Sequence, residues 1–362
     1  MTFPGFVDVH VHFRDPGVPE AETTASGLAA AAHGGFAAVV TMPNTTPACD
    51  SPEAIRGQRE EGKGKREEGG CRLLASACIT KGRAGKEVAD LEALAEAGAV
   101  FFTDDGSYVA DDKVMEEAMN RIAALNMVVC QHAMDPVELK GGVIRDCALA
   151  RKLGLPIISV ETETKAIRRD LSLCRETGCR LHIQHISTAA GVALVRDAQR
   201  EGLPVTAEAT PHHLLLTCDD LVADDANFKM APPLGNREDR AELRKAVKDG
   251  VLMFATDHAP HPVAKKSLGF ARSANGIVGL EVAIPITYAV MVEEEGMSVE
   301  DWAKAWWEKP LDIIAPRALP NRILRPTTVV VGAERTVDVG SFASLSRNCP
   351  YDGLKFRCWP EK

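Results

Sequence analysis

The chain has 362 residues, of which 45% are hydrophobic, enough to bury a large core in one sizeable domain with an appendage. Its net charge of −9, with no face rich in lysine and arginine, argues against nucleic acid as a partner. The ten cysteines form no C-x-x-C pair, no signal peptide is evident and no apolar run could span a membrane, so we expect a reduced, cytoplasmic protein without a disulfide framework.

Short apolar runs alternate along the chain with segments of helical spacing, which is typical of β/α units around a parallel sheet. Helical spacing is clearest over Glu22–His33, Val114–Leu125 and Ala189–Arg200. Eight parallel strands predict an α/β protein with a (β/α)8 TIM barrel over residues 1–316 and a reduced C-terminal β appendage over residues 317–362. The eight predicted strands are Phe6–His10, Phe36–Met42, Arg72–Cys78, Ala99–Thr103, Met127–His132, Arg180–His185, Pro204–Glu208 and Val251–Asp257.

The first predicted strand ends in two histidines separated by one residue. Because side chains alternate along a strand, His10 and His12 face the same way and can converge on one metal ion. A half-polar strand without a ligand is the simpler interpretation, but paired histidines are uncommon on an otherwise apolar strand. The pattern therefore favours a metal site.

Further candidate ligands fall where other predicted strands end. Asp104 and Asp105 follow the fourth strand, and the fifth, sixth and eighth strands end in His132, His185 and Asp257. The carboxyl-terminal rim of such a barrel is where active sites are built, so these residues are expected to meet there. Four imidazoles and two carboxylates suit zinc, with manganese or cobalt as substitutes. The set is large enough for two ions bridged by a carboxylate and by a hydroxide, which would be the nucleophile.

Five further histidines are expected to be structural. His33 precedes two glycines and is expected at a helix end. His182 lies three residues before the sixth-strand ligand, so alternation sends it to the opposite face, beneath a helix. His258 faces away from the site by the same argument, with a supporting role beside the ligands left open. His212 and His213 follow the seventh strand, and contact with a ligand is their alternative interpretation.

Seven segments spread over nearly the whole chain give it a resemblance to the dihydroorotases of the amidohydrolase superfamily. The HxH pair and the late aspartate are shared across that superfamily, whereas HFRDPG together with MPNT and DHAPH is specific to dihydroorotases. The segments are PGFVDVHVHFRDPG (Pro4–Gly17), MPNT (Met42–Thr45), FTDDG (Phe102–Gly106), HIQHISTAAG (His182–Gly191), TPHHL (Thr210–Leu214), DHAPH (Asp257–His261) and GIVGLE (Gly276–Glu281).

The resemblance implies a zinc-dependent enzyme with one or two ions per chain, two being expected. Asp257 would bind the first ion and shuttle the proton, first as general base and then as general acid. The histidines would divide between the ions, His10 and His12 on one, His132 and His185 on the other.

The bridge between the ions is implied to be an aspartate. Many superfamily members use a carboxylated lysine after the fourth strand, but no lysine occurs between Lys86 and Lys113. Similarity to members that carry FTDDG favours Asp105 and leaves Asp104 as a neighbour or the alternative.

The substrate implied by the resemblance is a small cyclic amide that bears a carboxylate. Arg14 lies two residues beyond His12 on the same face, and its planar fork suits a carboxylate, although an ion pair with Asp15 is the alternative. By similarity to the family, Asn44 and His261 complete the clamp, while Asn44 taken alone resembles a turn former. The implied reaction is the reversible cyclisation of N-carbamoyl-L-aspartate to L-dihydroorotate in de novo pyrimidine (UMP) synthesis.

The chain departs from the family pattern in the segments expected to line the substrate pocket. Ala231 stands where an asparagine is usual, so substrate affinity is expected to be weaker, and Gly235 stands where an arginine is usual. Ala274 and Asn275 replace the usual Pro-Phe before Gly276. None of these changes touches a predicted metal ligand.

The ends of the chain also depart from the family. Relatives normally begin with a β-rich segment that pairs with the C-terminal strands, whereas this chain starts at the first predicted barrel strand. The tail from Thr327 to Trp359 keeps parts of the family terminus, in 335–338 and 346–353. Its strands are expected to pack irregularly or to leave an apolar edge for a partner subunit, so a homo-oligomer is expected.

Two alternatives stay open at this point. An allantoinase or hydantoinase would share the metals and the ring-opening chemistry, although it has no need of HFRDPG. Some dihydroorotase-like chains are non-catalytic partners of aspartate transcarbamoylase, but those generally lack several of the metal histidines that are present here. Association of an active chain with that transcarbamoylase is also possible on this resemblance.

Overall fold

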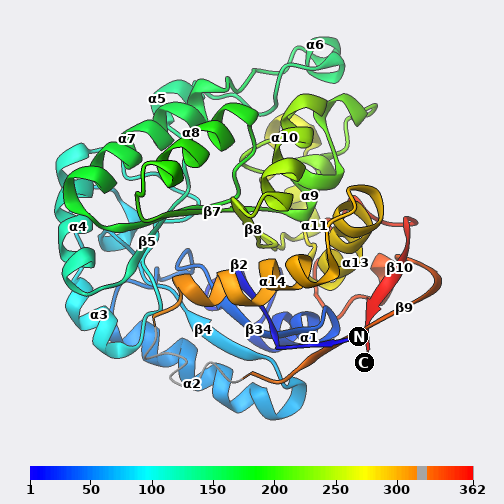
Figure 1. Cartoon of the computed structure of the whole chain (residues 1–362), viewed down its shortest axis with the longest axis horizontal. Helices are drawn as coiled ribbons and strands as arrows, with labels where there is room; N and C mark the ends of the chain where they lie inside the picture. Colours follow the sequence, from blue (N-terminus) through cyan, green and yellow to red (C-terminus); the bar gives the residue numbers. More distant parts are fainter. Residues whose placement is uncertain (316–323, 362) are drawn as a thin grey trace.

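The computed structural model describes residues 1–315 and 324–361, and only the backbone of residues 64–69. Helices surround a central barrel of strands, and the two ends of the chain lie close together beside it (Figure 1). The strands are β1 (Thr2–Phe3), β2 (Phe6–Val11), β3 (Phe36–Thr41), β4 (Arg72–Ala75), β5 (Val128–Gln131), β6 (Arg180–Ile183), β7 (Val205–Ala209), β8 (Leu252–Phe254), β9 (Thr327–Thr336) and β10 (Lys355–Pro360).

The α-helices include all three that the sequence predicts, at closely similar bounds. Thr188 caps the third of them, α8, because its side chain accepts a hydrogen bond from the Gly191 amide. The helices are α1 (Thr24–His33), α2 (Pro52–Gly69), α3 (Leu91–Ala97), α4 (Asp112–Ala124), α5 (Pro136–Leu139), α6 (Ala148–Leu153), α7 (Glu161–Thr177), α8 (Ala189–Arg200), α9 (Pro211–Leu215), α10 (Arg237–Lys248), α11 (Val263–Lys266), α12 (Gly269–Arg272), α13 (Ala283–Thr287) and α14 (Val299–Ile313).

The parallel strands form two sheets that join into a closed ring. One sheet has the order β2-β3-β4 and the other β5-β6-β7-β8. Phe102 forms parallel bridges with Ala77, beyond β4, and with Val129 in β5, while Val11 of β2 bridges His258 beyond β8. These bridges close the ring on both sides, and the predicted (β/α)8 barrel is confirmed.

The predicted fourth strand, Ala99–Thr103, is not a strand. Phe102 is its one residue in a parallel β-bridge, with Ala77 on one side and Val129 on the other, so no ladder of consecutive pairs forms. The segment nevertheless occupies the fourth position of the barrel through Phe102.

Two apolar clusters separate the inside of the barrel from the layer of helices. The inner cluster contains alternate strand residues such as Val7, Val40 and Val128, together with Leu311 of α14. Helix α14 covers the amino-terminal end of the strands, where Lys309 donates to the Gly250 carbonyl just before β8. Apolar side chains therefore fill the amino-terminal end of the barrel, and the polar side chains of its interior lie at the opposite, carboxyl-terminal rim.

The C-terminal segment forms a small antiparallel sheet with the beginning of the chain. Strands β9 and β10 pair with one register shift, and β1 pairs with Thr327 and Thr328. The expectation that the chain starts at the first barrel strand is therefore wrong, because Thr2–Phe3 belongs to this other sheet. Val330 and Val331 of β9 are each 41% exposed, which leaves apolar positions for the expected partner subunit.

The predicted boundary between a barrel over 1–316 and an appendage over 317–362 lies outside the described residues and stays a prediction. Within the described ranges, no helix has both the length and the apolar character needed to cross a membrane.

Candidate metal centre

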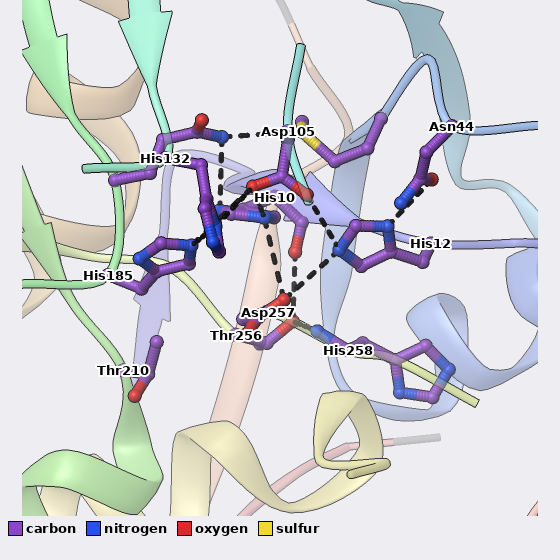
Figure 2. A network of polar contacts seen from close by, with 12 residues as sticks. His10, His12, Asn44, Asp105, His132, His185, Thr210, Thr256, Asp257 and His258 are labelled. Atoms are coloured by element: carbon purple, nitrogen blue, oxygen red, sulfur yellow. Dashed lines mark hydrogen bonds and ion pairs between the residues drawn. The ribbon is translucent and has the colours of Figure 1, made fainter. Parts of the chain in front are cut away.

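Six residues meet at the carboxyl-terminal rim, and we call them the histidine–carboxylate cluster: His10, His12, Asp105, His132, His185 and Asp257 (Figure 2). All six side chains are buried. They follow or end separate barrel positions, which is why residues up to 247 positions apart in the sequence can touch.

The two histidines at the end of β2 point at the same pair of carboxylates. Nε2 of His10 lies 3.3 Å from Oδ1 of Asp105 and 3.4 Å from Oδ1 of Asp257. Nε2 of His12 lies 3.3 Å from Oδ2 of Asp105 and 3.1 Å from Oδ1 of Asp257. The convergence that the i, i+2 spacing predicts is present in the structure.

Asp105 lies at the middle of the cluster, and Asp104 does not. Oδ1 of Asp105 is 3.5 Å from Nδ1 of His132 and 3.5 Å from Nε2 of His185. Asp104 instead accepts hydrogen bonds from the backbone amides of Ile79 and Thr80, at 2.8 and 3.1 Å, and from the Thr80 hydroxyl. Of the two aspartates that the sequence left open, the geometry therefore favours Asp105 as the bridging group.

The second pair of histidines is brought together by a turn. Nδ1 of His132 and Nε2 of His185 lie 2.8 Å apart. Strand β6 ends at Ile183, and His185 follows with φ at 34°. A positive φ is costly for a residue with a Cβ and redirects the side chain, so simple strand alternation no longer applies at this position.

The turn at His185 overturns the prediction for His182. Its ring does not lie beneath a helix but faces the cluster side of the sheet, with Nε2 donating to Oε2 of Glu208 at 3.0 Å. The prediction assumes that strand alternation relates His182 to His185, but the left-handed backbone at His185 redirects its side chain, so the two residues are not related in that way.

Glu208, at the end of β7, is a functional candidate that sequence reasoning missed. Its Oε1 accepts from Nδ1 of His10 at 2.6 Å and from the His185 amide at 3.2 Å. A carboxylate can only accept, so Nδ1 of His10 carries a proton, and Nε2 is the nitrogen that faces the cluster. The available signal was its position, a carboxylate at a strand end like the predicted ligands.

Asn44 plays the same part for the second histidine. Its Oδ1 lies 2.9 Å from Nδ1 of His12, which leaves Nε2 of that ring directed at Asp105 and Asp257. Asn44 was predicted to bind substrate, and only its Nδ2 group remains for that purpose.

The charges of the cluster suit a divalent cation. Burial alone would raise the pKa of Asp105, but His10 nearby holds that pKa well below its usual range, so the carboxylate is ionised. Asp257 behaves in the same way, because its contacts with His10 and His12 outweigh burial and lower its pKa. Burial lowers the pKa of both His12 and His132, which keeps these rings neutral, as metal ligands must be.

The pKa of His10 is shifted in the opposite direction from those of His12 and His132, and this shift also favours a cation at the site. Burial would lower the pKa of His10, yet Asp105, Glu208 and Asp257 together raise it well above its usual value. Three carboxylates therefore favour positive charge at this position, as they would favour a metal ion.

Unpaired polar atoms supply a direct test of whether a metal fits. Nε2 of His10 and Oδ1 of Asp105 are buried and have no hydrogen-bond partner among the described residues. Such atoms are costly unless something binds them. Ligand atoms of His10, His12 and Asp257, and those of His10, Asp105 and His185, lie within 4.8 Å of one another, so the donor set fits a divalent metal.

A cavity of about 410 Å³ opens onto the cluster, a size suited to a small-molecule substrate. Arg14, Asn44 and His261, the residues predicted to bind the substrate carboxylate, all line it. Ala231 and Asn275 line it as well, whereas Gly235 does not.

Arg14 and His261 lie next to each other at one side of the cavity. Nη2 of Arg14 lies 3.3 Å from Nε2 of His261, and Nε of Arg14 donates to the Pro260 carbonyl at 3.3 Å. Burial lowers the pKa of Arg14 to about 10, so the guanidinium is charged at neutral pH. Nε2 of His261 donates to the Asn275 carbonyl at 2.7 Å, so this N–H of His261 is already used within the protein.

The other histidines lie away from the cavity lining. His33 ends α1, with Nδ1 3.3 Å from Oε2 of Glu281. The His258 ring points away from the cluster, as predicted, and its Nδ1 accepts from the Gly279 amide at 3.3 Å (Figure 2). His213 donates to the Pro232 carbonyl at 3.1 Å, as a structural residue does, whereas Nε2 of His212 is buried without a partner among the described residues.

Sequence comparisons point to one family. A family model described as dihydro-orotase-like matches residues 1–190. A dihydroorotase of Bacillus caldolyticus is 41% identical over 99% of this chain and 84% of its own length, and one of Geobacillus sp. (strain WCH70) is 42% identical over 98% and 84%.

Structural comparisons find the same fold. The L-hydantoinase (dihydropyrimidinase) of Arthrobacter aurescens superposes with a TM-score of 0.83 at 25% identity, over 99% of this chain and 83% of that one. The dihydroorotase of Saccharomyces cerevisiae in complex with 5-fluoroorotic acid has a TM-score of 0.75 at 19% identity, over 100% of this chain and 98% of that one. At 19% identity, the second likeness speaks for the fold alone.

Proposed function

The chain belongs to the dihydroorotase family of the amidohydrolase superfamily, and from that premise we propose that its site interconverts N-carbamoyl-L-aspartate and L-dihydroorotate. One observation carries the assignment of the site: Asp105 faces four imidazoles at distances of 3.3 to 3.5 Å. Such an arrangement is costly without a cation and well suited to holding two.

The proposed ligands divide into two sets that share Asp105. His10, His12 and Asp257 would hold one ion, and His132 and His185 the other. We propose zinc, because imidazole nitrogens and carboxylate oxygens are its usual ligands in catalytic sites. A bound divalent ion supplies Lewis acidity toward the amide carbonyl and toward the attacking water.

Asp257 is the proposed proton carrier. In the hydrolytic direction the C–N bond of the ring breaks, and the ring nitrogen must receive a proton while the attacking water loses one. Asp257 is ionised, because His10 and His12 keep its pKa low, so it can accept the proton from the water and return it to the nitrogen. In the direction of synthesis the same group acts in the reverse order.

Arg14, Asn44 and His261 are the proposed carboxylate-binding residues. Arg14 supplies a half-buried positive charge with a planar fork, and Asn44 supplies the Nδ2 group that His12 leaves free. His261 lies 3.3 Å from Arg14 and helps to define that side of the cavity. Binding the carboxylate there would orient the reacting amide toward the cluster.

A hydantoinase-like activity is the second candidate within this fold. It is favoured by the structural likeness to hydantoinases, but that likeness comes at 25% identity or less, against 41% for dihydroorotases. The third possibility, a non-catalytic partner of aspartate transcarbamoylase, is disfavoured by the complete set of histidines.

We further propose a homo-oligomer in the cytoplasm, supported by the exposed Val330 and Val331 on β9. Association with aspartate transcarbamoylase stays a prediction from the resemblance.

The test is an assay of zinc-loaded protein with dihydroorotate, carbamoylaspartate, hydantoin and allantoin side by side, with chelator-treated protein and Asp257→Asn as controls. We expect turnover of the first two compounds, loss of turnover after chelation, and a kcat for Asp257→Asn lower by about 1000-fold. Preference for hydantoin or allantoin would replace the proposal with the second candidate, and turnover of none would favour the non-catalytic role.

A further inference from the structure

Residues 274–276 lie on the side of the cavity next to Arg14, and we call them the pocket wall. Asn275 and Gly276 line the cavity beside His261. The Asn275 carbonyl accepts the hydrogen bond from Nε2 of His261 at 2.7 Å. The position of this carbonyl therefore decides where the His261 ring lies, beside the guanidinium of Arg14.

A buried lysine behind the pocket wall holds this backbone. Lys266, the last residue of α11, is 9% exposed. Its Nζ donates to the carbonyls of Lys229, Ala274 and Gly276, at 3.1, 3.0 and 2.8 Å. An ammonium has three protons, and all three are directed at backbone carbonyls, two of which flank Asn275.

A second lysine extends the same support. The Lys229 carbonyl accepts from the Gly276 amide at 3.0 Å as well as from Lys266. Nζ of Lys229 donates to the carbonyls of Ala271 and Ser273, at 3.1 and 2.8 Å. The two lysines thus contact backbone carbonyls from α12 to the pocket wall, and Nδ2 of Asn348 also donates to the Gly276 carbonyl, at 3.1 Å.

Burying the ammonium of Lys266 at this position costs desolvation free energy. Among the described residues no carboxylate forms an ion pair with it, and its hydrogen bonds go to three backbone carbonyls, with Asp225 acting on its charge from farther away. Burial, with the nearby Lys229 charge, lowers its pKa to about 7. A methionine would fill a similar volume without that cost, and what it would lack is the three hydrogen bonds to backbone carbonyls.

We propose that Lys266 is a positioning residue for substrate binding, which acts by fixing the pocket wall and, through the Asn275 carbonyl, the ring of His261. The inference rests on the proposed function, because it assigns to this side of the cavity the carboxylate of the substrate. Lys266 touches neither the histidine–carboxylate cluster nor the cavity, so its loss should weaken binding and leave the chemical step intact.

The experiment compares Lys266→Met with Lys265→Met in the zinc-loaded protein. Lys265 is the exposed neighbour on the same helix, and its substitution removes one charge while keeping its backbone contact with the pocket wall, the carbonyl that accepts from the Ala274 amide. For Lys266→Met we expect KM for dihydroorotate to rise about tenfold, with kcat and zinc content within twofold of the unchanged protein. Lys265→Met should leave all three unchanged.

Two outcomes would overturn the inference. A folded, zinc-loaded Lys266→Met protein with unchanged KM would show that the wall does not depend on the ammonium. A fall in kcat with unchanged KM would show that the lysine acts on the cluster instead. If Lys266→Met does not fold, Lys266→Gln, which keeps two donors and loses the charge, is measured in the same way, with the same outcomes decisive.

A second measurement separates this inference from the proposed function. Hydrogen exchange of the Gly276 amide, which donates to the Lys229 carbonyl, needs no turnover. Faster exchange in Lys266→Met than in Lys265→Met would support the inference even if the protein turned over neither proposed compound, and equal exchange would contradict it. Absence of dihydroorotate turnover by the unchanged protein would count against the function alone.

Discussion

The histidine–carboxylate cluster is organised by hydrogen bonds and ion pairs between side chains, whereas the pocket wall is organised by hydrogen bonds from a lysine to backbone carbonyls. The cluster depends on buried carboxylates, with Glu208 bonded to the rings of His10 and His182. The wall depends on carbonyl groups gathered by Lys266. The difference suggests two kinds of failure: damage to the cluster should cost metal binding, and damage around the wall should cost substrate affinity.

The largest effect is expected from substitution of Asp105, the second of two adjacent aspartates. Asp105→Asn removes the negative charge that faces four imidazoles, so we expect metal affinity to fall more than about 100-fold and turnover to become undetectable. Metal content after dialysis and dihydroorotate hydrolysis measure the two effects.

Asp104→Asn is the matched control. It disturbs the hydrogen bonds with Ile79 and Thr80, so we expect a loss of about 1 to 3 kcal/mol in the free energy of unfolding with metal binding retained. Equal loss of metal in the two variants would contradict the assignment of the bridge.

A smaller loss of metal affinity is expected from Glu208→Gln, because the amide no longer fixes the proton of His10 on Nδ1. We expect metal to bind about 10- to 100-fold more weakly, as measured by competition with a chelator. Glu22→Gln changes another buried carboxylate that contacts a histidine, His258, away from the cluster. If that control weakened metal binding as much, the effect would not be specific to the cluster.

The same residue predicts a dependence on pH in the metal-free protein. Burial opposes ionisation of Glu208, but His10 and His182 lower its pKa from 4.5 to about 2. Its stabilising contribution is therefore complete above about pH 4.5 and is lost as the pH falls toward 2. Denaturant unfolding of the unchanged protein and of Glu208→Gln should differ most above pH 4.5, and a difference that grew toward pH 2 would reverse the sign.

Around the pocket wall, Arg14→Lys should raise KM without removing metal. Lysine keeps the charge and loses the planar fork that pairs with a carboxylate, so we expect a rise in KM of about tenfold. Steady-state kinetics and metal content are measured together. A variant that lost metal instead would place Arg14 with the cluster rather than with the wall.

The smallest effect is expected from Ala231→Asn. Ala231 lines the cavity and offers no hydrogen bond, and an asparagine could add one to the substrate. We expect KM to fall by about two- to fivefold with kcat unchanged. A higher KM would mean that the space beside Ala231 is needed for the substrate.

The histidine–carboxylate cluster could be predicted from the sequence, and the hydrogen bonds that hold the pocket wall could not. The barrel and the cluster could be predicted because they follow from spacing and from the position of ligands at strand ends, as for His10 and His12. The prediction of a fourth strand was wrong, because Phe102 is the one residue of that segment in a β-bridge, so no ladder forms. The predicted orientation of His182 was wrong, because strand alternation does not extend through His185, whose φ is positive.

Glu208 and Lys266 show what spacing leaves out. Glu208 reaches His10 across the barrel, at a separation of 198 residues, and no local pattern reports such a contact. Lys266 acts through backbone carbonyls, which every residue carries, so the sequence gives no sign of its partners. Both contacts depend on tertiary packing.

The most direct test of the central claim is a zinc titration of chelator-stripped protein, with bound zinc and dihydroorotate turnover recorded at each step. The account predicts no turnover without metal and a rise that reaches its limit at about two bound ions per chain. Full turnover by the stripped protein, or a chain with both ions bound that turns over neither dihydroorotate nor carbamoylaspartate, would contradict it.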